Sequence, residues 1–203
     1  MKIIIFGTGD CAQLAHFYLM NDTNHEVVGF CVNKKYQEIS EFNGLPVLCL
    51  ENLKYKPTEV KFFAPLYDNY LRLSKFLEIK KLGFDFISYV SSKSTCWGTV
   101  GQNSFIMEDN TIQPYVKIGD NVILWSGNHI GHHSIICDNV FISSHVVVAG
   151  HCKVNPFCWL GINSTIKDHV ELAEGSKIGM SACVINNTQI NKTYIGVPAK
   201  VKA

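Results

Sequence analysis

The chain has 203 residues, is 47% apolar and 17% charged, and carries a formal net charge of +1. This composition permits buried cores and excludes a disordered chain. The near-neutral charge gives no electrostatic attraction to nucleic acid or to an anionic membrane, and no apolar run approaches the ~18 residues that a membrane span needs. The opening Met1–Gly7 is too short an apolar run for a signal-peptide core, so we expect a cytoplasmic protein. The eight cysteines form no C-x-x-C pair, and we expect free thiols in a reducing compartment.

The first residues predict a Rossmann-like βαβ unit. Lys2–Phe6 is an apolar run that predicts a strand, and it ends in Gly7-Thr8-Gly9 with Ala12 three residues further on. Gln13–Met20 then predicts a helix, and Glu26–Cys31 predicts a second strand. A strand, a glycine turn and a helix in this order are typical of a nucleotide-binding opening, although a G-x-G-x-x-A sequence can also be a simple tight turn.

The end of the second predicted strand indicates which ligand this unit could hold. A dinucleotide fold places Asp or Glu here to bind the ribose, whereas this chain has Asn33, Lys34 and Lys35. The substitution argues against NAD and permits a phosphate-bearing ligand. An ordinary solvated loop is the alternative reading of the two lysines.

Three further elements complete the first half. Val60–Ala64 predicts a third strand, Tyr70–Lys81 an amphipathic helix, and Phe84–Val90 a last strand. The Ser- and Thr-rich segment Ser91–Thr99 predicts a connection to the second half. We therefore expect an α/β domain over residues 1–90 and a second domain over residues 91–203.

A six-residue repeat fills the second half. Every sixth residue from Val100 to Ile190 is Val, Ile or Leu, without a slip in register. The residue two positions earlier is usually small or β-branched, with Gly98, Asn110 and Asn128 as departures. Each unit predicts one short strand and one corner, so three units make a coil of eighteen residues, and coils stack at about 4.8 Å. The repeat predicts a parallel β-solenoid of about five coils over residues 100–190.

The six-residue pattern resembles the left-handed parallel β-helix of hexapeptide-repeat acyltransferases, which implies the handedness. The whole chain is similar to the sialic-acid O-acetyltransferase-like (NeuD/PglD-like) sugar acyltransferases. The segments that carry this resemblance are Phe6-Gly7-Thr8-Gly9, Asn69-Tyr70-Leu71-Arg72, Ile130-Gly131-His132-His133, Trp159-Leu160-Gly161-Ile162-Asn163 and Gly196-Val197-Pro198-Ala199-Lys200.

The resemblance implies an acetyl-CoA-dependent N-acetyltransferase that acts on the amino group of a UDP- or dTDP-linked amino sugar, in lipopolysaccharide or O-antigen biosynthesis. It further implies a homotrimer without a metal. His132 would be the general base, since imidazole titrates near neutral pH. Gly150, one coil later, would hold the oxyanion through its backbone N–H. O-acetylation of a sugar hydroxyl and a non-catalytic nucleotide-binding solenoid remain as alternatives.

Two positions depart from the family's pattern. An Asp or Glu usually follows the catalytic histidine and orients it, but His133 stands there. We expect His133 to take this place as a neutral hydrogen-bond acceptor. Nine residues after His132, where the family often has a histidine near CoA, stands Phe141.

The resemblance also implies two binding surfaces. The pantetheine arm of CoA would lie between subunits, along Phe141, Gly150, Ile162, Asn163, Gly179 and Met180. The nucleotide of the donor sugar would contact Gly7, Thr8, Gly9, Asn33, Lys34, Asn69 and Arg72.

Three histidines repeat with the period of the coil. His133, His151 and His169 are eighteen residues apart, so we expect them in one column on one edge. A γ-carbonic-anhydrase-like zinc enzyme is a further alternative, because that enzyme shares the solenoid. Its ligand pattern includes two histidines five residues apart, a spacing that no histidine pair has here. We therefore predict exposed corner residues and no metal site.

Overall fold

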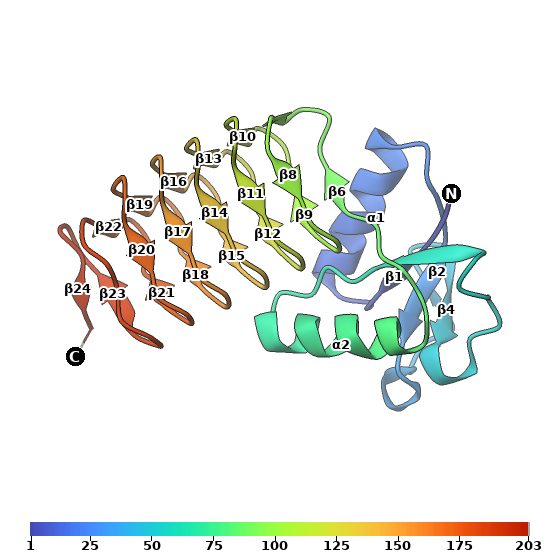
Figure 1. The fold of residues 1–203 in the computed structure, drawn as a ribbon. Coiled ribbons are helices and arrows are strands. Elements are labelled where there is room, and N and C mark those ends of the chain that lie inside the picture. Colours follow the sequence, from blue (N-terminus) through green and yellow to red (C-terminus); the bar gives the residue numbers. More distant parts are fainter. Residues whose placement is uncertain (203) are drawn as a thin grey trace. The chain divides into compact units, whose positions relative to one another are not determined.

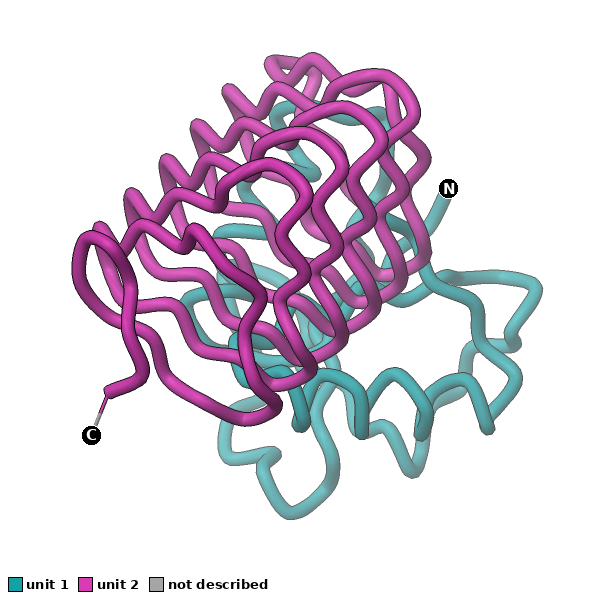
Figure 2. Tube along the Cα trace, turned by 60° about the vertical axis from the view of Figure 1, so that its left-hand side comes forward, with its two compact units in different colours: residues 1–88 teal, residues 89–203 magenta. Residues whose placement is uncertain are grey.

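The computed structural model describes residues 1–202, which form two compact units (Figures 1 and 2). The first unit is Met1–Ser88 and the second begins at Tyr89, two residues before the boundary expected from the sequence. Within the described residues, none of the helices combines the length and the hydropathy that crossing a bilayer requires.

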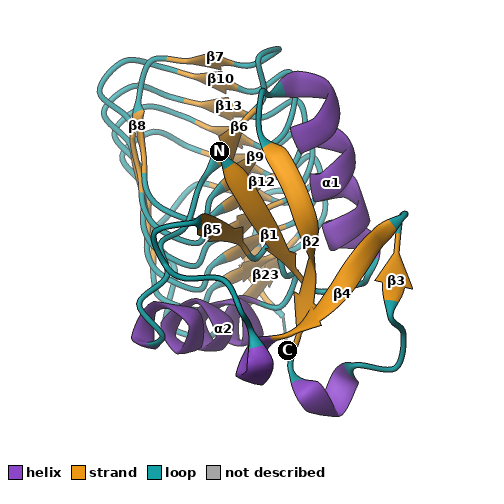
Figure 3. Ribbon diagram, turned by 90° about the vertical axis from the view of Figure 1, so that its right-hand side faces the viewer, coloured by secondary structure: helices purple, strands orange, loops and turns teal. Residues whose placement is uncertain are grey.

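The first unit is built on a five-stranded sheet with the order β3-β4-β2-β1-β5 (Figure 3). Strand β1 pairs in parallel with both β2 and β5, so the predicted βαβ arrangement is confirmed. The apolar runs form the strands because both faces of the sheet are buried, and Ile3, Ile4 and Ile5 have no exposed surface. Its elements in chain order are β1 (Lys2–Phe6), α1 (Asp10–Asp22), β2 (Glu26–Val32), the 3₁₀ turn η1 (Lys34–Tyr36), β3 (Glu41–Phe42), β4 (Leu45–Cys49), the 3₁₀ turn η2 (Leu50–Asn52), β5 (Val60–Phe63) and α2 (Asn69–Lys81).

Two features of the first unit differ from the sequence prediction. The hairpin of β3 and β4 was not expected, although its turn, Asn43-Gly44, has positive φ at both residues and is a typical hairpin signal. The prediction of one continuous strand over Phe84–Val90 is wrong. Phe86 makes only an isolated bridge to Phe62, and Tyr89 already belongs to the second unit.

The second unit is a solenoid of parallel strands, and strands of successive coils stack on one another to form three sheets. Strands one coil apart pair in register, as Ile112 with Ile130 and Ile130 with Val148. The repeated aliphatic residues point inward, and from Ile106 to Val184 each is at most 4% exposed. The sheets have the orders β22-β19-β16-β13-β10-β7, β20-β17-β14-β11-β8 and β24-β23-β21-β18-β15-β12-β9-β6.

From β8 to β22 the strands of the solenoid follow one another at the six-residue spacing of the repeat, and the strands at the two ends depart from it (Figure 1). They are β6 (Tyr89–Val90), β7 (Thr95–Cys96), β8 (Thr99–Val100), β9 (Phe105–Ile106), β10 (Thr111–Ile112), β11 (Lys117–Ile118), β12 (Ile123–Leu124), β13 (His129–Ile130), β14 (Ile135–Ile136), β15 (Phe141–Ile142), β16 (Val147–Val148), β17 (Lys153–Val154), β18 (Trp159–Leu160), β19 (Thr165–Ile166), β20 (Glu171–Leu172), β21 (Lys177–Ile178), β22 (Cys183–Val184), β23 (Thr193–Ile195) and β24 (Lys200–Val201).

Both ends of the solenoid correct the prediction. Residues 91–99 are not a linker, because β7 and β8 already form part of the first coil. At the other end the repeat stops before Ile190, which is 64% exposed. Tyr194 on β23 pairs with Ile178 instead. Strand β24 then pairs antiparallel with β23, whereas the preceding strands of the solenoid pair in parallel, and this pair ends the stack.

The corners of the solenoid require a left-handed backbone at one position. This position has φ between 54° and 67° in residues such as Asn103, Tyr115 and His151. Asn, Asp and His tolerate such φ values better than bulkier residues do. The corner geometry therefore fixes where His133, His151 and His169 stand.

Candidate active site

The predicted catalytic pair lies at the corner that follows β13. His132 and His133 are both exposed, and the Nδ1 atoms of the two rings are 3.0 Å apart. The backbone N–H of His132 donates to Oε1 of Gln113 at 2.9 Å. In the tautomer with a proton on His132 Nδ1, His133 accepts that proton's hydrogen bond and Nε2 of His132 keeps its lone pair for a substrate. This contact would allow His133 to orient His132, a role that stays a prediction.

Gly150 lies directly beside the His132 ring, one coil further along. A Cβ atom at Gly150 would stand only 2.9 Å from Cε1 and 3.0 Å from Nε2 of His132. Beneath Gly150, a Cβ at Gly131 would come within 2.5 Å of the Gly150 nitrogen. Glycine at 131 thus permits close stacking of the coils, and glycine at 150 leaves room for the imidazole in this position.

The backbone N–H of Gly150 is available for a ligand. At another edge of the solenoid, the corner N–H groups donate to carboxylates of the next coil. The N–H of Gln102 donates to Asp120 at 2.6 Å, and the N–H of Asp120 donates to Asp138 at 2.8 Å. Among residues 1–202, no acceptor receives the N–H of Gly150. A free N–H next to an imidazole is the arrangement that an oxyanion formed beside a general base requires.

The histidine column expected from the coil period is present. The rings of His133 and His151 stack at 4.9 Å with an interplanar angle of 12°, and those of His151 and His169 stack at 4.9 Å and 4°. Loss of solvent and the neighbouring imidazoles lower the pKa of His151. These surroundings favour the neutral form of His151, because like charges at this spacing repel.

The predicted CoA-binding residues fall into separate places on the solenoid. Ile162 precedes β19 and Met180 precedes β22, so the two residues lie one coil apart at the same corner. Their side chains are 42% and 69% exposed. Asn163 and Gly179 lie beside them. His132 and Gly150 lie at the corner after the strands of the sheet that contains β19 and β22, so one sheet width separates the two groups.

Phe141 belongs to neither of these groups. It lies on β15, is 4% exposed, and its ring is parallel to that of Trp159 at 5.8 Å. The side chain of Phe141 is thus used in packing against Trp159 and offers little surface to the CoA arm that the resemblance placed there.

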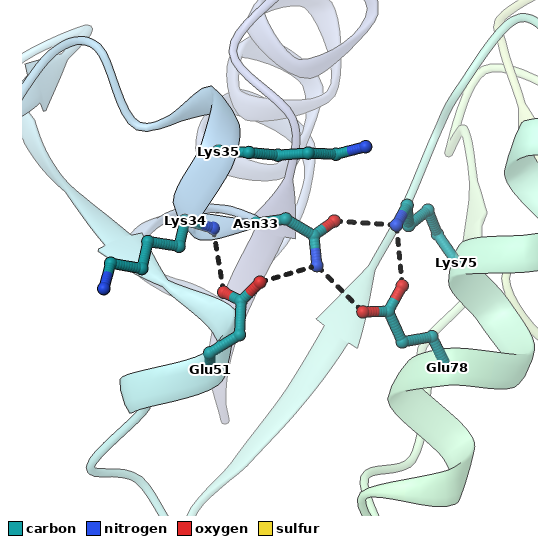
Figure 4. A pocket seen from close by; sticks show the side chains of 6 residues that line it. All are labelled: Asn33, Lys34, Lys35, Glu51, Lys75 and Glu78. Atoms are coloured by element: carbon teal, nitrogen blue, oxygen red, sulfur yellow. Dashed lines mark hydrogen bonds and ion pairs between the residues drawn. The ribbon is translucent and has the colours of Figure 1, made fainter.

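The first unit has a polar cavity of about 700 Å³ at the end of β2 (Figure 4). Asn33 is buried at its base and is held by charged neighbours: its amide donates to Glu78 at 2.8 Å and to Glu51 at 3.3 Å, and its carbonyl accepts from Lys75 at 2.7 Å. The lining residues are Asn33, Lys34, Lys35, Glu51, Lys75 and Glu78. The cavity therefore carries three lysines and two carboxylates around one fixed amide.

The carboxylates of this cavity are held in their charged form. Partial burial by itself raises the pKa of Glu51, but donors that include the backbone N–H groups of Glu51 and Lys34 outweigh it and lower the pKa to about 2. Burial likewise opposes ionisation of Glu78, and hydrogen bonds from Lys75 and Asn33 lower its pKa. The network is thus an ionic cluster at neutral pH.

The glycine turn after β1 has the expected geometry. Gly7 has φ of +110° and donates its N–H to Cys31 at 2.8 Å, which ties the turn to the end of β2. Gly9 begins α1 without a side-chain cap, and a Cβ there would meet nothing within 4 Å. Thr8 is half-buried between them. Asp10 occupies the first turn of α1, where a negative charge stabilises the helix.

Arg72 corrects one sequence-based assignment. Its side chain is buried, and its guanidinium donates to the carbonyls of Leu66 and Tyr67 and to Oδ1 of Asn69. Burial lowers the pKa of Arg72 to about 10. With these contacts Arg72 holds the loop before α2 and uses the Asn69 side chain to do so. The Arg72 side chain is buried away from any substrate, whereas contact of the half-buried Asn69 with the nucleotide stays a prediction.

Solved structures resemble the chain over nearly all of its length. PerB from Caulobacter crescentus, solved with CoA and GDP-perosamine, gives a TM-score of 0.91 at 20% identity and covers 100% of this chain and 98% of that one. The acetyltransferase domain of PglB from Neisseria gonorrhoeae gives 0.86 at 19% identity, with 99% of both chains covered. These likenesses confirm the fold class, an α/β region followed by a left-handed β-helix.

The repeat itself matches a known sequence family. Residues 98–132 and 115–150 match the bacterial transferase hexapeptide (six repeats) family. Both matched ranges lie within the solenoid. Among curated proteins, the serine acetyltransferase of Salmonella typhimurium is 29% identical over 100 residues, which are 44% of this chain and 37% of that protein. The chain spans well under half the length of such relatives.

Two residues, one in each unit, were not foreseen from the sequence. Gln113 accepts the hydrogen bond of the His132 backbone N–H. Gln113 precedes His132 by nineteen residues, which is one coil plus one residue, so the coil period could have indicated this contact. Lys75 completes the polar cavity from α2. No spacing in the sequence connects it to Asn33, since their contact depends on how α2 packs.

Proposed function

We propose that the chain is an acetyl-CoA-dependent N-acetyltransferase acting on the amino group of a nucleotide-linked amino sugar. The observation that carries the proposal is the imidazole of His132 packed against Gly150, whose N–H is free. PerB, which shares the fold, was solved with CoA and GDP-perosamine, and both molecules belong to the proposed classes of co-substrate and acceptor.

The proposed reaction uses His132 as the base. Its Nε2 accepts a proton from the sugar amine as the nitrogen attacks the thioester carbonyl carbon, so the C–N bond forms and the carbonyl oxygen becomes an oxyanion. The N–H of Gly150 donates to that oxyanion. Collapse of the intermediate breaks the C–S bond, and the imidazolium returns its proton to the departing CoA sulfur. His133 accepts from Nδ1 of His132 throughout and keeps the ring oriented.

We assign acceptor binding to the first unit. The cavity at Asn33 has three lysines and a fixed amide, groups that suit the phosphates and the base edge of a nucleotide. The glycine turn Gly7-Thr8-Gly9 remains a predicted contact for the same ligand. Because acetyl-CoA is a cytoplasmic metabolite, the proposed reaction belongs to the cytoplasm.

We also propose a homotrimer. The outward side chains of the sheet between the two site edges include no lysine, arginine or carboxylate in the described strands; they are Thr95, Thr111, His129, Val147, Thr165 and Cys183. The neighbouring sheet carries Lys117, Lys153 and Glu171 outward. An uncharged face is the better candidate for burial against a second copy.

The deciding experiment follows release of free CoA with a thiol reagent. Acetyl-CoA is offered with UDP-, dTDP- and GDP-linked amino sugars to the wild type, His132→Ala and the control His169→Asn. We expect turnover with one amino sugar, a loss of ~10²-fold or more in His132→Ala, and near wild-type rates in the control. Turnover that survives His132→Ala would remove His132 as the base, and release only with hydroxyl acceptors would favour O-acetylation.

A further inference from the structure

Three imidazoles meet at the candidate active site in a way the histidine spacing did not predict. One nitrogen from each of His132, His133 and His151 lies within 4.8 Å of the other two, and all three residues are exposed. The rings of His133 and His151 are stacked, while the His132 ring stands at about a right angle to both, 5.2 and 5.1 Å away. The group therefore combines two neighbours in the column with one residue beside it.

The backbone holds these three residues in place. The N–H of His151 donates to the carbonyl of His132 at 2.9 Å, which is a bond between successive coils. His133 and His151 both occupy the left-handed corner position, with φ of 60° and 58°. The relative positions of the three Cα atoms are thus set by the solenoid, and only exposed side chains need to rotate.

We propose that His132, His133 and His151 form a reversible site for Zn²⁺ or a similar divalent transition metal, and that its occupation inhibits the enzyme. Zinc binds imidazole nitrogen at about 2.0–2.1 Å in a tetrahedral arrangement, so its ligands lie ~3.4 Å apart. The Nδ1 atoms of His132 and His133 are 3.0 Å apart, and one nitrogen of each of the three rings lies within 4.8 Å of the other two, so rotation of the exposed side chains can bring all three to that separation. Their lone pairs would replace water on the ion, and a water would keep the fourth position.

Inhibition follows from the chemistry of His132 and rests on the proposed function. A ring bound through Nε2 has no lone pair left for a proton. A ring bound through Nδ1 carries its proton on Nε2 and cannot accept another. Metal binding itself does not depend on what the enzyme acetylates, so the two parts of the proposal can be tested separately.

The binding test titrates the purified full-length protein with Zn²⁺ alone by calorimetry, and with Co²⁺ alone by visible absorption. His151→Asn removes one ligand, and asparagine occupies the same corner position at Asn103, Asn121 and Asn163. His169→Asn is the matched control, because His169 stacks on His151 but lies outside the group. We expect one ion per chain in the wild type and the control, at least ~10-fold weaker binding in His151→Asn, and the Co²⁺ spectrum of a nitrogen-ligated site.

Absence of saturable binding, or equal affinity in all three proteins, would overturn the site. Should His151→Asn fail to fold by circular dichroism, His133→Asn provides the second variant and must weaken binding to a similar degree. The activity test adds Zn²⁺ to the CoA-release assay. We expect the wild type to be inhibited and restored by a chelator, and His151→Asn to lose this sensitivity when its rate with Zn²⁺ is compared with its own rate in the absence of metal. Inhibition that is unchanged in His151→Asn would refute this part, whereas an inactive wild type would count against the proposed function and leave the binding result standing.

Discussion

At the scale of single residues, Gly150 has two tasks that a side chain would disturb. Its hydrogen leaves room for the His132 ring, since a Cβ would stand 2.9 Å from Cε1 and 3.0 Å from Nε2. Its N–H is free to bind an oxyanion. The residue thus couples the position of the base to the position of the proposed oxyanion hole.

Gly150→Ala should therefore reduce catalysis more than stability. Gly150 is absent from the residues with positive φ, so alanine can adopt its backbone conformation. The methyl group would displace the exposed imidazole, and a shift of about 1 Å in a catalytic group costs ~10²-fold in rate. We expect kcat to fall by about that factor with the melting temperature nearly unchanged. A variant with full activity would show that His132 need not occupy this place.

At the scale of the elements, Asn110 shows why the repeat has exceptions. Its side chain is buried, donates to the carbonyls of Met107 and Trp125, and accepts from the N–H of Asn128 one coil later. A small apolar residue at this position could not satisfy these backbone groups. The departures at Asn110 and Asn128 are thus part of how successive coils are joined.

Replacing Asn110 should destabilise the solenoid. In Asn110→Val the buried N–H of Asn128 loses its acceptor, and an unsatisfied buried group costs about 1–3 kcal/mol. The carbonyls of Met107 and Trp125 lose one donor each but keep the Ser94 hydroxyl and the Asn128 amide. We expect the free energy of unfolding to drop by about 1–3 kcal/mol, measured by chemical denaturation. The control is Thr111→Val, at the neighbouring exposed position of β10, which should change the unfolding free energy by less than about 0.5 kcal/mol. Equal effects of the two substitutions would contradict the role of Asn110.

The ionic cluster in the first unit predicts a pH dependence of stability. The pKa of Glu51 is about 2 in the folded chain against an ordinary value of 4.5. Because the folded value is the lower one, the contribution of Glu51 is complete above pH 4.5 and is lost as the pH falls toward 2. Glu51→Gln should flatten this part of the curve of denaturation midpoint against pH. Glu41→Gln on β3 is the control and should retain the wild-type slope.

The sequence could predict the repeating parts of the fold and not their ends. The period of six identified the inward column because each aliphatic residue meets the same surroundings in every coil. Ile190 obeys the pattern but is exposed, since nothing in the spacing reveals that Tyr194 takes the next inward place. Arg72 was misjudged for a related reason: a buried, hydrogen-bonded arginine and a ligand-binding one look the same in sequence.

The candidate site was predictable to the extent that it follows the coil. His132 and Gly150 are eighteen residues apart, so their contact could be expected before the structure was known. The approach of His151 to His132 could not, because it depends on how rings at adjacent corner positions turn toward each other. The cavity at Asn33 was visible only as a missing acidic residue and two lysines, while Lys75 comes from a distant helix.

At the scale of the whole molecule, the uncharged sheet face makes the proposed trimer testable. Val147 on β16 is 39% exposed on that face, and Ile135 on β14 is 40% exposed on the charged one. We expect light scattering to give the mass of three chains for the wild type and for Ile135→Lys. Val147→Lys should dissociate the assembly, because the interface would bury an unpaired charge. A monomeric wild type, or a trimeric Val147→Lys variant, would contradict the assignment of this face.

The stacking of coils in register has a consequence for how such a chain can evolve. An insertion of six residues at a corner between His132 and Gly150 would preserve the buried column, yet it would move every later residue to the next side of the coil. Gly150 would then leave the edge occupied by His132 while the core stayed intact. An insertion of eighteen residues away from this corner would lengthen the molecule and leave every edge as it was. The buried column thus depends on a period of six residues, whereas the site depends on a period of eighteen. A change in length can therefore move residues away from the catalytic edge without unfolding the protein.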